Sequence, residues 1–480
     1  MSTRPPQSAA HHEDGTTVRW EPRFRRRAML QRAISGAAIL AVGPALAACG
    51  SVKSAAPNPA HPPQSLIFQP YPYGYPDINT AFKLMEQVLE PFEKQNNVDI
   101  KLVLFNTDAD NVSAIIGGDG PDIIYGTQYG PYLSQNLLMN LSPLLQQDGI
   151  STSIWSKGQV EYFQRPNGTF AIPGTIETFV YLLNLSDFDR AGISYPGTDW
   201  TLEEFLTSAQ ALANPSKQHF GTNFAMQWDD VEGYQWFFEA FGGSINNAQG
   251  TTCTLNTSPC IQAGNWLYEQ LIWPKLGVTR NSARLGGKWD AKQLAAGDVS
   301  MSVLAPIQIL TVVLTLPSEI NWTMYPFPTF PAGKMNWASA GFFAINRETK
   351  HSNLAWEFLK YVTVGTDWQR AMIQMNFLGP IRTDLWPEWK ATAEELAPSL
   401  KNKGLQYYLD AVEQGYAVPG TFFDSNDSHT ASALDTTFAA LASRQQTDVA
   451  AAFSAVQNQI RAIESGAPST APTAGSAQAG

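Results

Sequence analysis

The most constraining feature of this sequence is a strand–helix–strand pattern that begins at residue 66. The apolar run Leu66 to Phe68 is followed by a loop, and then by apolar residues at helical spacing from Phe82 to Phe92. Asp99 to Phe105 alternates as a second strand, and Pro121 to Tyr125 predicts a third. This order predicts a parallel α/β sheet with right-handed crossovers. Ligands bind such sheets beyond the carboxyl ends of the strands, where we expect the loop and the segment Tyr125 to Tyr132.

The composition adds two limits. The chain has 480 residues and is 44% hydrophobic, so it can bury a large core and is not disordered over most of its length. That length exceeds one compact core and predicts about two or three lobes. The formal net charge is -11, and an acidic chain is poorly suited to bind nucleic acid through its phosphates. We therefore expect no nucleic-acid partner.

Residues 1–48 have the order of an export signal. Basic residues from Arg23 to Arg27 lead into the apolar stretch Ala33 to Ala48, which is shorter than the ~20 residues of a spanning helix. The segment Arg26 to Gln31 resembles a twin-arginine signal, although Arg-rich leaders also serve the general secretion route. Leu46 to Gly50 resembles the bacterial lipobox, in which the cysteine thiol receives a lipid and becomes the new N-terminus. The alternatives are a true membrane anchor and a cysteine that follows an apolar run by accident.

Low-complexity segments flank the folded body. Residues 49–65 start at the proposed lipidation site Cys49, are rich in Pro and Ala, and predict an extended linker. Residues 466–480 are rich in Ala, Gly, Ser, Thr and Pro and predict a disordered tail. We expect an exported protein that its lipid holds at the outer face of the cell membrane, or in the periplasm.

The cysteines agree with an exported protein. Apart from Cys49, the chain has only Cys253 and Cys260, which predict a small disulfide in an oxidising compartment. The alternative is two thiols that happen to be neighbours in the sequence. The six histidines are scattered, so the sequence predicts no metal site, and we expect no cofactor.

Several segments, taken in order, resemble one protein family: the extracellular solute-binding proteins of ABC importers, in particular the maltose-binding-like group that carries sugars. The resemblance extends from about residue 66 to 463. The segments that carry it are Gly118 to Ile124 with Leu137 to Leu141, Gly168 to Asn184, Phe188 to Ile193 with Asp199 to Phe205, Phe241 to Ile245, Ala296 to Met301, Ser339 to Phe342 with Ala355 to Leu359, and Gly379 to Arg382.

The resemblance implies an α/β protein with two lobes joined by hinge crossovers and a ligand cleft between them. Crossings are expected near Gly174 to Glu177, near Tyr325 to Phe330 and around Gly365. The first lobe would then comprise residues 66–176 and about 325–365, and the second lobe 177–324 and about 366–465. A monomer would capture a mono- or oligosaccharide and deliver it to membrane permease subunits by lobe closure.

The resemblance also suggests which residues bind the sugar. Carboxylates accept hydrogen bonds from sugar hydroxyls, and aromatic faces cover sugar rings. Glu177 matches an acidic sugar-contacting position of the family; the alternative is a surface carboxylate at a strand start. Trp228 and Asp229 precede a turn that lines the cleft in the family. Trp337 is either a stacking face or a core residue.

Three tyrosines complete the set of expected ligand-binding residues: Tyr73 in the first loop, and Tyr125 and Tyr129 after the third strand. Here the chain departs from the family, because Gly126 and Tyr129 stand where maltose binders have Trp and Asp. Ile307 likewise stands where the family has Trp. These departures argue against a linear glucose oligomer as the ligand.

Two other classes of protein remain as alternatives. A secreted, lipid-anchored carbohydrate-active enzyme would also need carboxylates and aromatic rings in a cleft, but it requires a spaced carboxyl pair that the sequence does not single out. The sequence has no nucleophile elbow, P-loop or dinucleotide-binding glycine motif. A structural or adhesive lipoprotein is the third possibility. We expect a binding protein rather than an enzyme.

Overall fold

The computed structural model describes residues 64–70, 78–105, 107–175, 177–224, 231–247, 252–278, 292–339, 341–376, 378–413, 417–418 and 428–464. Cys49, Tyr73, Trp228 and Asp229 lie outside these ranges. At Glu177 and Trp337 the structure describes the backbone. Within the described part, no helix is long and apolar enough to cross a membrane.

The first sheet contains the predicted strand–helix–strand unit. β1 (Gln64–Phe68) pairs in parallel with β2 (Val98–Leu102), and α2 (Ile78–Asn96) connects them. β1 also pairs in parallel with β3 (Ile123–Gly126). Far along the chain, β14 (Phe342–Ile345) joins the sheet between β3 and β6 (Ile172–Pro173), antiparallel to both. The strand order is β2-β1-β3-β14-β6, which confirms the predicted parallel start of the sheet.

The second sheet has the order β10-β9-β11-β8-β12. Its strands are β8 (Val180–Asn184), β9 (Phe220–Asn223), β10 (Gly277–Val278), β11 (Val299–Leu304) and β12 (Trp322–Tyr325). β8 is antiparallel to both of its neighbours, whereas β9 is parallel to β10 and β11. Each sheet has a set of residues in a cluster of its own, Phe342 and Ala344 for the first sheet and Leu183 and Met301 for the second. A further cluster contains residues of both sheets, among them Phe68 and Leu182. The chain thus has two α/β layers that share part of their core.

The helices follow local sequence signals. The N-terminus of α8 (Leu202–Leu212) carries a capping box between Thr201 and Glu204. α10 (Ser258–Asn265) continues as a π-helix, Trp266–Ile272. The remaining α-helices before β14 are α3 (Asp108–Gly117), α4 (Tyr129–Ser134), α5 (Ser142–Gln147), α6 (Lys157–Phe163), α7 (Leu185–Ala191), α9 (Val231–Ala240), α11 (Lys292–Ala296) and α12 (Gln308–Thr311). A hairpin of β4 (Gln164–Arg165) and β5 (Gly168–Thr169) follows α6.

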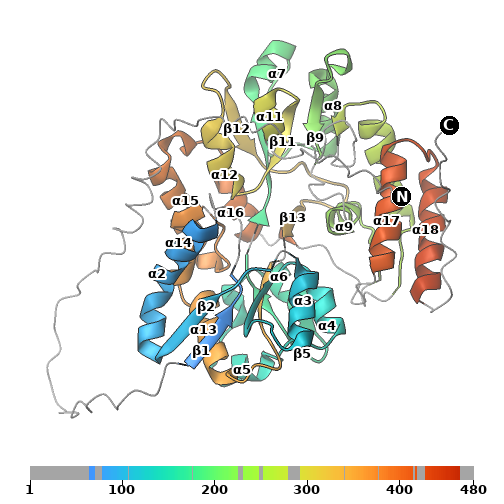
Figure 1. Ribbon diagram of the computed structural model, residues 1–480. Helices are drawn as coiled ribbons and strands as arrows, with labels where there is room; N and C mark the ends of the chain where they lie inside the picture. Colours follow the sequence, from blue (N-terminus) through green and yellow to red (C-terminus); the bar gives the residue numbers. More distant parts are fainter. Residues whose placement is uncertain are drawn as a thin grey trace, which may run out of the picture. The chain divides into compact units, whose positions relative to one another are not determined.

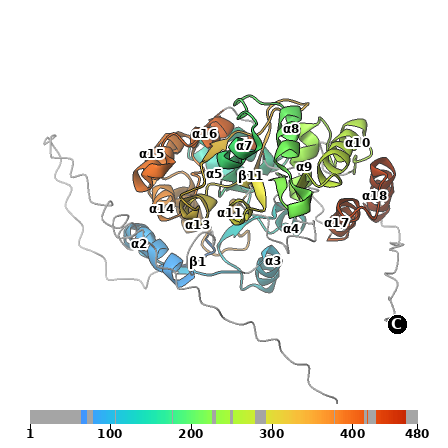
Figure 2. The ribbon, with the colours of Figure 1, turned by 90° about the horizontal axis from the view of Figure 1, so that it is seen from above.

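The C-terminal part is helical: α13 (Ser352–Thr363), α14 (Asp367–Asn376), α15 (Trp386–Leu396), α16 (Gln406–Glu413), α17 (Ser428–Ala442) and α18 (Val449–Glu464). α17 and α18 lie side by side (Figure 1, Figure 2). α14 packs against α2 and α13, and the ring centroid of Trp368 is 5.7 Å from that of Phe68 in β1. The chain therefore stays with the first sheet beyond Gly365. The crossing expected at Gly365 is wrong, because burial of Trp368 ties α14 to β1.

The outer edge of the second sheet is covered by a loop. β12 is the last strand of this sheet. The backbone N–H of Met324 donates to the carbonyl oxygen of Lys403 at 2.8 Å, and Lys403 Nζ donates to the carbonyl oxygen of Trp322 at 2.6 Å. Gly404 has a φ of 90°, and a Cβ there would lie 2.4 Å from the Met324 carbonyl oxygen. This loop can follow β12 so closely because glycine occupies position 404.

Candidate functional site

A three-stranded sheet contains two strands that lie, in chain order, between strands of the two large sheets. It consists of β7 (Glu177–Thr178), β13 (Asn336–Ser339) and β15 (Ala417–Val418), in the order β15-β13-β7. The chain reaches β7 after leaving the first sheet at β6 and before entering the second at β8; β13 lies between β12 and β14 on the return. We call β7, β13 and β15 the crossover sheet.

The crossover sheet brings two of the predicted ligand residues onto neighbouring strands. In the antiparallel pair β7–β13, Glu177 is opposite Ser339 and Thr178 is opposite Ala338. Trp337 is opposite Val418 in the parallel pair β13–β15. Positions directly opposite in an antiparallel ladder share one face, as do alternate positions of one strand. The backbone positions of Glu177, Ser339 and Trp337 therefore share one face of this sheet.

Asn336 fastens the crossover sheet to the start of β8. Its side-chain Nδ2 donates to the backbone oxygen of Phe179 at 2.6 Å, and the Phe179 N–H donates to Asn336 Oδ1 at 3.4 Å. Asn336 is 2% exposed, so water does not compete for these bonds. β8 begins at the next residue, Val180. The sequence analysis did not identify Asn336, whose only signal is a lone amide in a strand-like segment.

Gly341 fixes the other end of the first crossing. Its carbonyl oxygen accepts from the backbone N–H groups of Gly174 and Thr175, at 2.7 Å and 3.3 Å. A Cβ at position 341 would lie 2.1 Å from the hydroxyl oxygen of Tyr125 and 2.5 Å from Thr175 Oγ1. Gln159 also contributes, because its Nε2 donates to the Thr175 carbonyl oxygen at 2.9 Å. The backbone that follows β6 can therefore pack this closely against residue 341 only because that residue is glycine and has no Cβ.

Tyr125 and Tyr129 are core residues rather than ligand-stacking faces. Tyr125 is 3% exposed and Tyr129 is 1% exposed. Phe343 packs against Tyr125 with ring centroids 5.4 Å apart, and Phe342 packs against Tyr129 at 5.3 Å. Adjacent residues of β14 point to opposite sides of the sheet, so this strand buries one tyrosine on each side. The prediction that these rings cover a sugar is therefore wrong for this structure.

The loop after β3 is held by a carboxylate that the sequence analysis missed. Asp108 Oδ2 accepts hydrogen bonds from the backbone N–H of Thr127 at 3.1 Å and from its hydroxyl at 2.6 Å. Asp108 Oδ1 accepts from the hydroxyl of Tyr132 at 2.7 Å. Burial, together with this carboxylate, raises the pKa of Tyr132, so its hydroxyl remains a donor. A Cβ at Gly126 would lie 2.4 Å from the Phe342 ring, which explains why no aromatic side chain occupies that position.

The two cysteines differ from the prediction. Both are thiols, and both are buried. Cys260 lies in the first turn of α10, where its Sγ donates to the Ser244 carbonyl oxygen at 3.4 Å, and burial raises its pKa. Cys253 and Asn246 form an isolated antiparallel β-bridge through their backbones. The carbonyl oxygen of Cys253 accepts a hydrogen bond from NH2 of Arg461 at 3.2 Å. The expected disulfide is thus absent from this structure.

The described residues contain no group of three His, Cys, Asp or Glu side chains that could hold a metal ion. What the crossover sheet offers is polar backbone and a carboxylate position at the junction of two α/β layers.

The comparisons with known proteins agree with this geometry. Residues 76–364, more than half of the chain, match the model of the family described as bacterial extracellular solute-binding protein. The chain belongs to this family. Our identification of a solute-binding protein from the sequence is therefore confirmed. No protein among the curated sequences matches the chain.

Three solved structures of bacterial proteins show the same fold. An ABC substrate-binding protein from Listeria monocytogenes, in complex with cycloalternan, is 18% identical with a TM-score of 0.67, over 85% of this chain and 100% of that one. The GacH receptor of Streptomyces glaucescens, described unliganded and with acarbose, is 19% identical with a TM-score of 0.62, again over 85% and 100%. UgpB from Mycobacterium tuberculosis, in complex with glycerophosphocholine, is 17% identical with a TM-score of 0.64, over 84% and 98%. The solute-binding protein thus has the two-lobed α/β fold of periplasmic binding proteins.

Proposed function

We propose that this solute-binding protein captures a sugar, or a similar polyhydroxylated solute, for an ABC importer. The observation that carries the proposal is the register of β7 against β13, which places Glu177 and Trp337 on neighbouring strands at the junction of the two layers. A carboxylate and an aromatic ring are the pair of groups that a sugar needs. Structures of the same fold carry cycloalternan and acarbose, which supports a saccharide ligand.

Ligand binding would act through lobe closure. A ligand shifts a conformational equilibrium only by as much as it binds one state better than the other. A sugar held between the lobes makes more contacts when the lobes are closed, so it favours closure. The segments that absorb the motion are those beside Asn336 and Gly341, which tie the crossover sheet to β8 and β6. The closed surface then engages membrane permease subunits, and no chemistry takes place in this chain.

The location follows from the N-terminal sequence. Residues 1–48 would direct export, Cys49 would carry the lipid, and residues 49–65 would link the lipid to the folded body. A monomer tethered in this way stays at the outer face of the membrane, beside its permease.

The experiment that tests this function uses the protein that begins at residue 49, with Cys49 replaced by serine so that it is soluble. Melting temperatures are measured with a panel of mono-, di- and oligosaccharides and with glycerophosphocholine. A saccharide that binds raises the melting temperature by an amount that grows with the logarithm of its concentration relative to its Kd, and chromatography recovers it intact. A panel without any shift, or hydrolysis of a saccharide by the purified protein, would refute the proposal.

A further inference from the structure

The outer edge of the second sheet has a cavity of about 490 Å³, between β12 and the loop that precedes α16. We call it the edge pocket. No strand of the crossover sheet contributes a residue to its described lining. Its volume falls within the range of small-molecule sites, roughly 300–1,000 Å³. The polar residues that line it are Thr323, Tyr325, Lys401, Asn402, Lys403 and Tyr407.

The described lining of the edge pocket includes two lysines and no carboxylate. Lys403 Nζ donates to the carbonyl oxygen of Trp322 at 2.6 Å and lies 4.8 Å from the centroid of the Trp322 ring. An ammonium group has three N–H donors, so two remain for a ligand. Lys401 is exposed. Within the part of the chain that the structure describes, neither lysine pairs with a carboxylate, so the positive charge of the pocket is not neutralised there.

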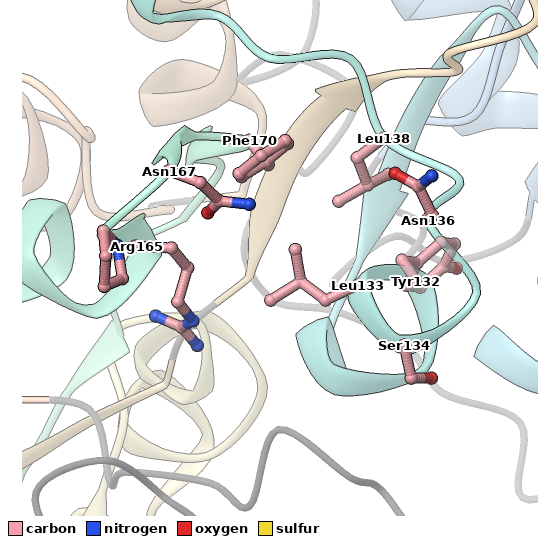
Figure 3. A pocket seen from close by; sticks show the side chains of 9 residues that line it. Tyr132, Leu133, Ser134, Asn136, Leu138, Arg165, Asn167 and Phe170 are labelled. Atoms are coloured by element: carbon pink, nitrogen blue, oxygen red, sulfur yellow. The ribbon is translucent and has the colours of Figure 1, made fainter.

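These lysines differ from the cation of a smaller cavity beside the first sheet. Figure 3 shows that cavity, of about 280 Å³, which Arg165 helps to line. NH1 of Arg165 donates to the carbonyl oxygens of Tyr162 at 2.7 Å and Gln164 at 2.9 Å. The guanidinium carbon lies 5.2 Å from the centroid of the Tyr129 ring. Protein groups thus already engage Arg165, whereas the edge pocket has positive charge to offer a ligand.

The loop that carries the two lysines is fixed through its backbone. The N–H of Lys401 donates to the carbonyl oxygen of Pro398 at 3.2 Å, and the N–H of Lys403 donates to that of Leu400 at 3.1 Å. The carbonyl oxygen of Lys403 accepts from the N–H of Met324 in β12 at 2.8 Å. The loop therefore holds its position before a ligand arrives, which lowers the entropic cost of binding.

The remaining polar groups of the edge pocket are donors and mixed donor–acceptors. The ring centroids of Tyr325 and Tyr407 are 6.3 Å apart. Burial raises the pKa of Tyr325, and burial, together with Tyr325 and Asp410, raises the pKa of Tyr407. Both hydroxyls therefore stay protonated at neutral pH and can donate to an anion. The hydroxyl of Thr323 and the amide of Asn402 can both donate and accept, which matches the hydroxyl groups of a polyol.

We propose that the edge pocket binds a phosphate ester of a polyol. A phosphate monoester carries about -1.5 to -2 charges at pH 7, and lysine binds phosphate as a point charge. The phosphate is held by Lys401 and Lys403, and the polyol hydroxyls bind Thr323 and Asn402. Such a group comes either from a free solute or from the headgroup of an anionic lipid. The site is separate from the ligand held at the crossover sheet.

The test is calorimetric titration of the soluble protein with glycerol 1-phosphate, with glycerol as the neutral probe. Lys401→Gln removes the exposed cation. Asn402→Asp adds a carboxylate and keeps the shape of a side chain whose φ is 61°, a backbone that aspartate also tolerates. We expect glycerol 1-phosphate alone to bind the parent, and each variant to weaken that binding about fivefold or more, because an attraction between charges about 4 Å apart in water is lost or opposed. Both variants should keep the melting temperature of the parent, since both positions are exposed.

Lys217→Gln is the matched control. Lys217 is an exposed lysine outside the edge pocket, and its replacement should leave glycerol 1-phosphate binding unchanged. Lys401→Gln should likewise leave saccharide affinity unchanged. A saccharide panel without any shift would therefore refute the proposed function and leave the edge pocket to be judged by its own titrations.

Sedimentation with lipid vesicles identifies the source of the phosphate. Binding to vesicles of phosphatidylglycerol and phosphatidylcholine, but not to phosphatidylcholine alone, that is lost in Lys401→Gln would assign the site to a lipid headgroup. Binding of glycerol 1-phosphate without vesicle binding would assign it to a free solute. No binding in either assay, or equal binding in the parent, Lys401→Gln and Asn402→Asp, would overturn the proposal. A loss in Lys217→Gln as large as in Lys401→Gln would also overturn it, because the effect would then come from net charge alone.

Discussion

Replacement of Gly341 by alanine is expected to lower the free energy of unfolding by about 1–3 kcal/mol, the usual cost of overpacking a core. The added methyl carbon would lie 2.1 Å from the Tyr125 hydroxyl oxygen and 2.5 Å from Thr175 Oγ1, whereas non-bonded atoms prefer roughly 3.5–4.0 Å. Tyr125 is 3% exposed and cannot swing into solvent. The backbone at 341 is held by the N–H groups of Gly174 and Thr175, so relief requires movement of the crossing itself.

A second substitution tests whether the hydroxyl of Tyr125 causes the loss of stability expected for Gly341→Ala. Tyr125→Phe removes the nearest clashing atom, and alone it loses one hydrogen bond to Thr175, 3.3 Å long, at a cost of about 0.5–1.5 kcal/mol. In the double variant the methyl group gains room, although the ring carbon of residue 125 still lies 2.8 Å away. The two losses should therefore be less than additive, with a coupling energy of about 0.5–3 kcal/mol.

The assay is denaturant unfolding followed by circular dichroism, with the midpoint and slope compared for each variant. Gly117→Ala is the matched control, because a Cβ at Gly117 meets nothing within 4 Å and the position lies at the end of α3. It should leave stability unchanged or slightly raised. A Gly341→Ala variant as stable as the parent, or strictly additive losses in the double variant, would refute the packing described around the first crossing.

Four further predictions follow from the same residues. Glu177→Ala should weaken binding of the identified saccharide by about 1.5–3 kcal/mol without lowering the melting temperature; equal affinity by calorimetry would remove Glu177 from the site. Cys49→Ala should abolish lipid labelling and membrane association, and labelling that persists would contradict the lipobox. Cys253 and Cys260 should both react with an alkylating agent after unfolding without reductant, and neither should react in the folded protein, because both are buried; protection after unfolding would indicate a disulfide. Burial raises the pKa of Tyr361 to about 12, so folding favours its protonated form; stability should fall as pH rises from the ordinary value near 10 through 12, and Tyr361→Phe should flatten that fall in pH-dependent unfolding.

The fold was predictable where the signal is local. The β1–α2–β2 unit and α8 follow from periodicity and from the capping box at Thr201, because these signals act over a few residues. Assignment of α14 to a lobe failed because amphipathic periodicity does not say which surface a helix covers. That choice depends on the contact between Trp368 and Phe68, two residues that are distant in the sequence.

The candidate site was predictable only in part, for a related reason. The crossover strand with Glu177 could be expected from the resemblance to the family. The burial of Tyr125 and Tyr129 could not be expected, because the residues that bury them, Phe343 and Phe342, lie in a strand late in the chain. Asn336 carries no local signal of its partner, the Phe179 backbone. Long-range partners thus decide which aromatic and amide side chains reach solvent.

The loop over β12 has a consequence for how this protein meets other chains. An uncovered edge strand offers a row of unpaired N–H and C=O groups, to which a strand of another molecule can add. Here the N–H of Met324 and the carbonyl of Trp322 are already engaged by Lys403, and Gly404 lets the loop lie against the strand. The second sheet therefore has one less surface on which aggregation can begin. A side chain at position 404 would push the loop away and expose that edge.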